Sequence, residues 1–529
     1  MTKRQYLLLY FVSLAFFGAL GLLQKTPGYM DAAYYYSVGK QIAMGKGFTE
    51  PFIWNYLASP TALPVTAFTY WMPLAGILSA IGMTVFHSSA YWAARVPFLF
   101  LAGTIPLFNV YFASLFSQKK LTLFLAAAAG LACGYYLPYL TITETFVPYF
   151  VLGGTFFVLA YKLSIQKQAH LKQICFALLL GLTAGLMHLT RADGLLWLVG
   201  SWLLLLFFWD FPKTYIRKQF GLCGVTLLGY LIIMGPWYIR NLQQFKNLFP
   251  PGSNLAIYFT NYNDLFAFPI SQINLAHFLN SGIGQIILAR LNAGIANIES
   301  LTGIVCEILL LPFMAAGLWQ LRKEKLVQFS LVMLTAIFLV MTVVFPFAGQ
   351  RGGFFHSITA LQCFFWGVTP IGFELLITKL AQIRKWKAER SLYLLGGTLV
   401  FFLVILSFIF FTQKVFGKTI AQKFTWDERY ENFEVIEAIL QRSGFSLLQP
   451  VMVNDSPGYY AVTGRSAIQM TSGSVDTDIA VMKQFGAEYL LIDEDHPGLL
   501  DPFYLRPATY GQLEFFNKFD GFVIYKLTD

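Results

Sequence analysis

Long apolar runs separated by short polar segments dominate the chain up to about residue 412. Many of these runs are close to 20 residues long, the length that an α-helix needs to cross the hydrocarbon core of a bilayer. We therefore predict a polytopic α-helical membrane protein with about eleven transmembrane helices. Their expected extents are 5–24, 90–114, 121–138, 145–162, 172–190, 194–210, 220–236, 303–320, 327–346, 357–376 and 391–412. The run at 64–86 is broken by Pro64 and Pro73, so we assign it to a surface insert and keep a twelfth span as the alternative.

Positive charges between the runs predict the orientation of the chain. They fall on one side of the membrane in strict alternation, whereas the short loops opposite contain few. The clusters are Lys3-Arg4, Lys119-Lys120, Lys162 with Lys167 and Lys172, Lys213 with Arg217-Lys218, Arg322-Lys323 with Lys325, and Arg384-Lys385 with Lys387. The positive-inside rule then places the N-terminus in the cytoplasm and the C-terminal region outside the cell membrane. A twelfth span would break this alternation. The first run has no small-x-small cleavage site before Asp31, so we interpret it as a retained anchor.

Composition agrees with a membrane protein and argues against a nucleic-acid partner. Only 12% of the residues are charged, against about 25% in soluble proteins. The net charge of +10 comes from the short loop clusters, which are a topology signal and form no binding stripe. The five cysteines lie in or beside apolar runs without metal-ligand spacing, so we expect them to be small core residues.

Three segments are expected to project outward: the loops at about 25–89 and 237–302, and a tail from 414. The tail has the composition of a soluble domain. Its pattern predicts helices at 427–442 and 476–486 and buried strands at 450–453, 489–492 and 522–525. Alternating strands and helices indicate a small α/β domain at 414–529, following a membrane module at 1–413. Asp455-Ser456-Pro457-Gly458 and Thr463-Gly464-Arg465 are its chemically distinctive spots, and loop and capping roles account for them most simply.

Two carboxylates at the outer membrane face are candidates for chemistry. Asp31 follows the first run within an aromatic segment, where it could act as a general base or only cap a helix. Glu144 precedes the fourth run, where it could share a metal with Asp31 or only favour the start of a helix through the helix dipole. If both belong to one site, their carboxylates should lie within about 10 Å of each other.

Several cationic groups lie at the same level of the membrane. Arg95, Arg240, Arg351 and His356 form a pool from which phosphate-binding groups could come, because arginine binds phosphate bidentately. Arg191 and Asp193 bracket a tight outer turn and can be explained as a local pair, and His188 as a buried, hydrogen-bonded side chain. The chain has no glycine-rich phosphate loop, zinc-type cluster or nucleophile elbow, so we expect no nucleotide cofactor. A phosphate substrate would then arrive on a lipid.

Together these segments resemble the GT-C membrane glycosyltransferases, in particular the group similar to protein O-mannosyltransferases and the lipid A aminoarabinose transferase. The matching segments are Tyr29–Tyr35, Tyr70–Leu74, Ala94–Pro97, Thr143-Glu144, Leu189–Gly194, Pro236–Asn241, Arg351–Ser357 and, in the tail, Asn454–Tyr460 with Thr463–Arg465. The resemblance covers nearly the whole chain. It implies a polyprenyl-phosphate sugar donor and an active site facing away from the cytoplasm. By position, Asp31 matches the catalytic first-loop acid, Glu144 the second-loop acid and Arg95 the arginine that opens the second span. At Ala32 the chain departs from protein O-mannosyltransferases, which carry an Asp-Glu pair there, so a protein acceptor is not singled out.

The expected function is therefore transfer of a sugar from a lipid-linked phosphate to a glycan, lipid or protein acceptor, with inversion and with Asp31 as base. A divalent metal (Mg or Mn) is left open. A transporter or flippase and a non-catalytic envelope scaffold are the alternatives; of the acids, only Glu307 lies well within a span. In the tail, Tyr459, Tyr460 and Arg465 could form a surface for a glycan acceptor, or the tail could be only a packing lid.

Overall fold

The computed structural model describes residues 1–165, 170–208, 216–418 and 424–528. Lys167 and Lys213 of the positive clusters lie outside these residues. Contacts within the chain define two compact units, each assembled from three separate segments. The membrane unit consists of Met1–Gly21, Phe98–Leu242 and Leu288–Thr412, and the loop–tail unit of Leu22–Pro97, Gln243–Ile287 and Gln413–Asp529. Both outward loops contribute to the unit that contains the tail, whose last segment begins at Gln413.

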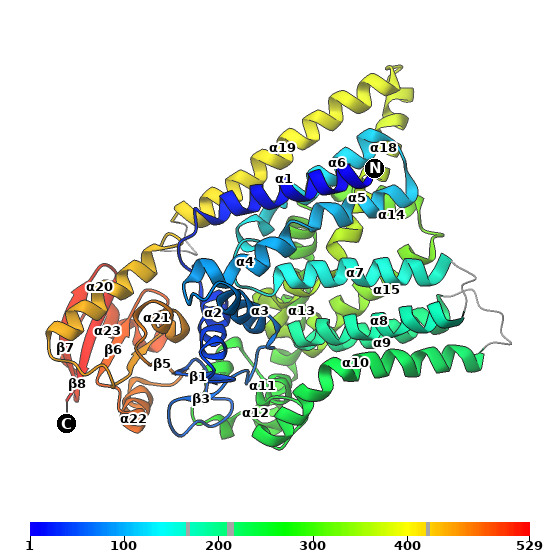
Figure 1. The fold of residues 1–529 in the computed structure, drawn as a ribbon. Coiled ribbons are helices and arrows are strands. Elements are labelled where there is room, and N and C mark those ends of the chain that lie inside the picture. The colour runs from blue at the N-terminus through cyan, green and yellow to red at the C-terminus, as the bar shows by residue number, and fades with distance from the viewer. Residues whose placement is uncertain (166–169, 209–215, 419–423, 529) are drawn as a thin grey trace. The chain divides into compact units, whose positions relative to one another are not determined.

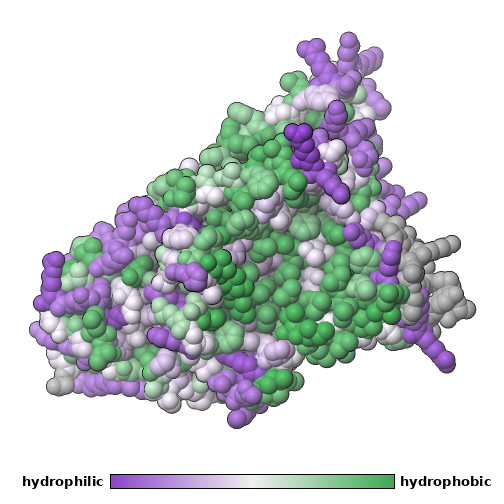
Figure 2. Space-filling model, viewed as in Figure 1, coloured by the Kyte–Doolittle hydropathy of each residue, from purple (hydrophilic) through white to green (hydrophobic). Residues whose placement is uncertain are grey.

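Apolar helices make up the membrane unit. Among the described residues, eight helical segments are long and apolar enough to cross a bilayer: Lys3–Gly21, Tyr91–Phe116, Phe146–Leu163, Leu171–Thr190, Arg217–Phe245, Lys325–Val344, Thr359–Ile383 and Ala388–Phe416. The expected spans at 121–138 and 194–210 are the shorter helices α6 (Lys120–Leu131) and α9 (Leu195–Phe207). The count of about eleven spans therefore stays a prediction, while the multi-pass architecture is clear. Hydrophobic residues cover the helices α7–α10 on the face shown in Figure 2.

The helices of the chain have the following bounds: α1 Lys3–Gly21, α2 Met30–Ala43, α3 Leu74–Val85, α4 Tyr91–Ala102, α5 Ile105–Phe116, α6 Lys120–Leu131, α7 Phe146–Ile165, α8 His170–Thr190, α9 Leu195–Phe207, α10 Ile216–Phe245, α11 Pro251–Leu255, α12 Leu275–Asn280, α13 Gly282–Glu299, α14 Leu311–Gln320, α15 Lys325–Leu339, α16 Pro346–Ala348, α17 Phe354–Ser357, α18 Thr359–Ile383, α19 Ala388–Phe416, α20 Glu428–Arg442, α21 Ser456–Thr463, α22 Val475–Phe485 and α23 Asp501–Leu505. Figure 1 shows α7, α8 and α9 side by side, and these neighbours are in contact. Helix α18 is the central helix, because it contacts α5, α6, α7 and α14 and is buried over most of its length.

The expected span at 303–320 is broken. Helix α13 continues into a π-helix at Ser300–Val305, and α14 begins only at Leu311. Between them, Glu307 and Ile308 have φ of +48° and +55°, a conformation that L-residues other than Asn and Asp rarely adopt. Cys306 and Glu307 are buried at this break, whereas Ile308 is exposed.

The loop–tail unit is built on a six-stranded sheet with the order β2-β5-β4-β6-β8-β7. Its strands are β2 (Phe52–Ile53), β4 (Val451–Val453), β5 (Ala467–Gln469), β6 (Tyr489–Ile492), β7 (Leu513–Phe519) and β8 (Phe522–Leu527). β2, β5, β4 and β6 are parallel, and β8 and β7 continue the sheet antiparallel. β1 (Thr49–Glu50) and β3 (Val65–Thr66) form a separate antiparallel pair. The edge strand β2 comes from the first loop, about 400 residues before its partner β5, so this loop and the tail fold as one body.

Local sequence explains the tail elements. In α20 the apolar residues Tyr430, Phe433, Ile436 and Leu440 recur at helical spacing and are fully buried. β4 and β6 are buried on both faces, as expected of parallel strands that read as continuous apolar runs. These elements, with α22 and β8, lie where the pattern predicts them. The structure adds α21, β5 and β7, which the pattern did not indicate.

Candidate active site

Glu144 lies in the turn that leads into α7. Its carboxylate accepts hydrogen bonds from the Thr145 hydroxyl (2.7 Å) and from the backbone N–H of Phe146 (3.0 Å), so it caps the start of the helix. The side chain is nonetheless almost fully buried. Burial raises the pKa of Glu144 to about 7, although the Thr145 hydrogen bond and the charge of Arg191 act to lower it. The capping role is therefore real, but it leaves a carboxyl group that can change its protonation state near neutral pH.

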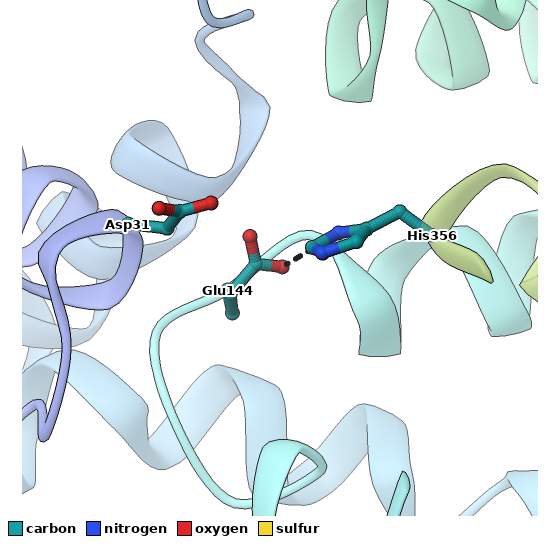
Figure 3. A group of neighbouring side chains, drawn as sticks. All are labelled: Asp31, Glu144 and His356. Carbon is teal, nitrogen blue, oxygen red and sulfur yellow. Dashed lines mark ion pairs between the residues drawn. The ribbon is translucent and has the colours of Figure 1, made fainter. Parts of the chain in front are cut away.

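His356 faces Glu144 from α17. Its Nδ1 atom lies 3.9 Å from Oε2 of Glu144, too far for a hydrogen bond, and has no hydrogen-bond partner among the described residues. Figure 3 shows the two side chains pointing toward one another. The imidazole stacks on the Phe146 ring at 3.9 Å. Burial, and then the charge of Arg191, lowers the pKa of His356 well below its ordinary value, so the ring is neutral. A neutral imidazole nitrogen opposite a carboxylate is a pair of donors suited to a divalent metal.

The backbone before His356 explains how it reaches this position. Residues Gly349–Gly353 form a kinked π-turn in which Gly352 has φ +105°. A Cβ on Gly353 would lie 2.6 Å from the carbonyl oxygen of Ala348, so this close approach requires glycine. The glycines of the Arg351–Ser357 segment thus bend the chain so that α17 presents His356.

Arg191 belongs to the same neighbourhood, which the sequence interpretation missed. It does form the expected ion pair with Asp193 (2.9 Å). It also donates hydrogen bonds to the carbonyl oxygen of Gly353 and the hydroxyl of Ser357, both at 3.3 Å. Arg191 is therefore the cation that acts on both Glu144 and His356. In the sequence, only its position beside an outer turn pointed to Arg191. Residues 353 and 357 become its hydrogen-bond partners only in the folded protein.

Asp31 lies in the first turn of α2, and Tyr29 occupies the N-cap position. The capping alternative for Asp31 is therefore wrong in detail, although an acid in the first turn still favours the helix through its dipole. The chain just before it is held by the tail. Trp426 donates its indole N–H to the carbonyl oxygen of Thr26 (3.0 Å), and Asp427 accepts from the N–H (2.8 Å) and hydroxyl (2.7 Å) of Thr26. Gly28, with φ +80°, passes so close to the Trp426 ring that no Cβ would fit.

The three candidate arginines lie in different surroundings. Arg95 is buried in the loop–tail unit, where it donates to the carbonyl oxygen of Gln24 (2.6 Å) and lies over the Tyr91 ring. Arg240 lies over the Trp237 ring and donates to the side chain of Asn241 (3.0 Å). Arg351 is exposed in the kinked turn before α17. Arg351 thus shares a local segment with His356.

The tail residues expected to bind an acceptor are buried instead. Tyr459 is 0%, Arg465 2% and Tyr460 8% exposed. Arg465 pairs with Glu437 through two hydrogen bonds of 2.8 and 2.7 Å, Tyr459 donates to the same carboxylate, and Tyr460 accepts from Gln41. Their polar groups are used inside the unit, so these three residues offer no open stacking surface. His188, by contrast, is buried and hydrogen-bonded to Tyr230, as expected.

Asp455 has the capping role that accounts for it most simply in the sequence. Its carboxylate accepts from the N–H of Gly458 (2.9 Å) as the N-cap of α21, and Pro457 lies in the first turn. Gly464, with φ +73°, ends this helix. The Asn454–Arg465 segment is therefore a capped helix between two parallel strands.

Solved structures with a similar fold exist, whereas comparison of sequences finds no relative. No family model and no curated protein sequence matches the chain. Among solved structures, the archaeal oligosaccharyltransferase AglB from Archaeoglobus fulgidus, in complex with an inhibitory peptide and a dolichol-phosphate, is similar with a TM-score of 0.58 and 13% identity over 95% of this chain and 70% of that one. The Archaeoglobus fulgidus oligosaccharyltransferase in complex with Zn and sulfate has a TM-score of 0.58 and 12% identity over 92% and 68% of the chains.

ArnT from Cupriavidus metallidurans, bound to undecaprenyl phosphate, is similar with a TM-score of 0.56 and 11% identity over 99% of this chain and 98% of that one. Identities this low show shared architecture. The match nonetheless extends over nearly the full length of both chains, including the region of the soluble tail. The chain thus shares the fold of these oligosaccharyltransferase and ArnT structures.

Proposed function

We propose that the protein is a GT-C glycosyltransferase that moves a sugar from a polyprenyl-phosphate-linked donor to an acceptor outside the cytoplasm. The buried pair of Glu144 and His356 is the observation that carries the proposal. Its members face each other without a hydrogen bond, in a fold whose solved relatives bind dolichol-phosphate or undecaprenyl phosphate. Buried polar groups are normally paired within the protein, so an unpaired imidazole nitrogen opposite a carboxylate indicates an external ligand.

Asp31 is proposed as the catalytic base because, by position in the sequence, it matches the catalytic first-loop acid of the GT-C enzymes. The proximity of Asp31 and Glu144 expected from the sequence is part of the proposal. The acceptor hydroxyl gives its proton to Asp31, and its oxygen forms a bond to the anomeric carbon. The bond from that carbon to the donor phosphate breaks, and the lipid phosphate leaves with the electron pair. A single displacement inverts the anomeric carbon, and phosphate needs little acid assistance to leave.

The donor set of Glu144 and His356 fits a divalent metal. The unpartnered Nδ1 of His356 and the carboxylate of Glu144 would supply one nitrogen and one oxygen ligand. Histidine favours manganese or zinc over magnesium, which prefers oxygen ligands. When bound, such an ion would neutralise phosphate charge. Without it, the neutral His356 imidazole and the Arg191 guanidinium would be the groups able to donate to the phosphate.

The phosphate-binding cations are drawn from Arg95, Arg240, Arg351 and Arg191. Arg191 is the strongest candidate, because it already influences Glu144 and His356. Arg95 donates a hydrogen bond to the backbone of the first loop, so we propose that its main role is to stabilise that loop.

The tail is proposed to position the first loop. Trp426 and Asp427 fix residues 26–28, directly before Asp31. Since Tyr459, Tyr460 and Arg465 are buried, the packing-lid alternative is favoured over acceptor recognition by these residues. The acceptor class, whether glycan, lipid or protein, stays open, and membrane lipids are the expected surroundings of the membrane unit.

The test is a transfer assay with the full-length protein in lipid vesicles, using radiolabelled polyprenyl-phosphate sugars and candidate acceptors. Asp31→Asn should lower turnover by about 100- to 10,000-fold, the usual contribution of a general base. Asp476→Asn is the matched control, because Asp476 is an exposed acid in the first turn of α22. Full activity of Asp31→Asn would contradict the assigned base.

Two further outcomes separate the alternatives. Measurable lipid or solute flux without sugar release would support a transporter, and neither activity would support a scaffold. Metal content, measured by mass spectrometry before and after chelation, should fall in Glu144→Gln and His356→Ala. Retention of the same metal in both variants would place any metal elsewhere.

A further inference from the structure

Glu307 is a buried acid that the proposed site does not use. Its side chain is 1% exposed, and neither carboxylate oxygen has a hydrogen-bond partner among the described residues. It lies in the membrane unit at the break between the π-helix Ser300–Val305 and α14. An ionisable group inside a membrane bundle is costly unless it is paired or functional, so it needs a specific explanation.

The backbone around Glu307 is strained at the same place. Glu307 and the next residue, Ile308, both have left-handed φ values, which L-residues adopt only where surrounding structure holds them. The N–H of Ile308 donates back to the carbonyl oxygen of Thr302 (3.0 Å), and that of Leu310 to Cys306 (2.9 Å). These bonds close the break and hold the Glu307 side chain inside the bundle.

A glycine makes room for the carboxyl group. Gly134, which follows α6, has φ +54°, and a Cβ there would lie 2.5 Å from the carboxyl carbon of Glu307. The N–H of Gly134 donates to the Ser407 hydroxyl (3.0 Å), so this backbone donor is not available to Glu307. Two segments far apart in the sequence, 133–134 and 306–308, thus both adopt left-handed backbone conformations next to the Glu307 carboxyl group.

The groups that face Glu307 are neutral and already engaged. The titratable ones are Cys133, Tyr136 and Cys306. The Cys133 thiol donates to the carbonyl oxygen of Gly130, and the Tyr136 hydroxyl to that of Phe355 (3.0 Å). Cys306 contacts the sulfur of Met314.

From the other two helices at this place, Ser407 (α19) accepts from Gly134 and donates to the carbonyl oxygen of Leu403, and Gln362 (α18) donates its amide to the carbonyl oxygen of Val305 (2.7 Å). A hard metal cation needs about six oxygen ligands, and the described residues around Glu307 do not provide them. A proton needs only the carboxylate itself.

We propose that Glu307 is a proton-binding site in the membrane unit, which carries a proton in the described conformation and releases it only when the broken helix at 306–310 rearranges. The proton exchanges with solvent when the break opens and returns when it closes, so no other reactant is involved. The groups around Glu307 differ from those at Glu144 and His356: Tyr136, which faces Glu307, donates its hydroxyl to the carbonyl oxygen of Phe355 and not to either of these residues.

Infrared spectroscopy of the full-length protein in lipid nanodiscs tests this directly, because a protonated carboxyl group has a carbonyl band that carboxylates lack. At pH about 9, buried acids such as Glu144 and Asp478, with pKa values of about 7, are ionised. We expect a residual carboxyl band in the wild type that is missing in Glu307→Gln. The matched control is Glu299→Gln, an exposed acid at the end of α13, which should leave the band unchanged. Gly134→Ala should shift the band, because the added Cβ displaces the carboxyl group.

Absence of the band in the wild type, or an identical band in Glu307→Gln, would overturn the proposal. So would a band that disappears at fixed pH when sodium or potassium is added, since that would assign the site to a metal cation. If Glu307→Gln does not fold, wild-type protein treated with a hydrophobic carbodiimide decides the question, because this reagent modifies protonated carboxyl groups. Modification of Glu307 but not Glu299 supports the proposal, and the reverse contradicts it. Neither measurement depends on glycosyl transfer, so its outcome is independent of the proposed function.

Discussion

The buried ion pair of Arg465 and Glu437 offers a sharp test of whether the tail motif is structural. The Arg465 side chain is 0% exposed and forms two hydrogen bonds with Glu437. It also donates to the carbonyl oxygens of Ser446 and Gln449 and lies 4.2 Å above the Phe445 ring. One guanidinium group thus joins the turn before β5 to α20 and to the connection between α20 and β4. The perturbation is Arg465→Met, which keeps most of the side-chain volume and removes the charge.

The expected loss follows from what Arg465→Met leaves behind. Glu437 remains as a buried carboxylate without its cation, which typically costs about 3–5 kcal/mol. The carbonyl groups of Ser446 and Gln449 lie in an exposed connection where water can replace the guanidinium, so they add little. At about 1.4 kcal/mol per factor of ten, protection against local opening should fall by roughly two to three and a half decades. The double variant Arg465→Met/Glu437→Leu should lose less than the single one, because it leaves no unpaired buried charge.

Hydrogen exchange measured by mass spectrometry on the full-length protein at constant pH provides the assay. Peptides from α20 and β5 should lose protection in Arg465→Met. Arg442→Met is the matched control, because Arg442 is an exposed arginine in the last turn of α20. A loss below tenfold in Arg465→Met, or a larger loss in the double variant, would refute this reasoning. It would also restore acceptor binding as an explanation for the charge of Arg465.

Three further predictions concern the loop–tail unit. Burial raises the pKa of Asp478 to about 7, so folding favours its protonated form. The contribution of this group to stability should be fully present below pH about 4 and fall by up to roughly 4 kcal/mol as the pH rises to about 7; Asp478→Asn should remove this part of the pH dependence of thermal unfolding. Deleting residues 413–529 exposes the fully buried β2 residues Phe52 and Ile53, which alone contribute about 3–6 kcal/mol, so limited proteolysis should cut the first loop rapidly in the truncated protein and slowly in the full chain. Trp426→Ala should lower turnover through misplacement of Asp31 while donor KM changes little; a larger effect on KM than on kcat would contradict a positioning role.

Much of the membrane unit and of the tail core follows from local sequence. Apolar runs of span length predict the long helices, and continuous apolar strands predict β4 and β6. The capped start of α21 was readable in principle, since an acid followed by proline begins many helices, but the same letters are typical of a turn. β5 was missed because its three residues, Ala467–Gln469, form no continuous apolar run like that of β4.

Other features depend on contacts that no local pattern contains. β2 joins a sheet whose other strands lie about 400 residues later, and its two residues give no sign of this partner. The burial of Arg465 could not be predicted from the sequence, because arginine side chains are mostly exposed in proteins. Only the pairing with Glu437 makes its burial favourable. Arg191 looked like a local pair because its second set of partners, at residues 353 and 357, comes from a distant turn.

The shared sheet determines which roles are open to the tail. A domain attached by a linker could bind an acceptor while the rest of the chain folds without it. Here the tail's sheet takes its edge strand from the first loop, and Trp426 and Asp427 hold residues 26–28. The tail is thus part of the structure that carries Asp31, and removing it changes the surroundings of the proposed base. An effect of tail variants on transfer therefore indicates acceptor recognition only where hydrogen exchange shows that the first loop remains protected.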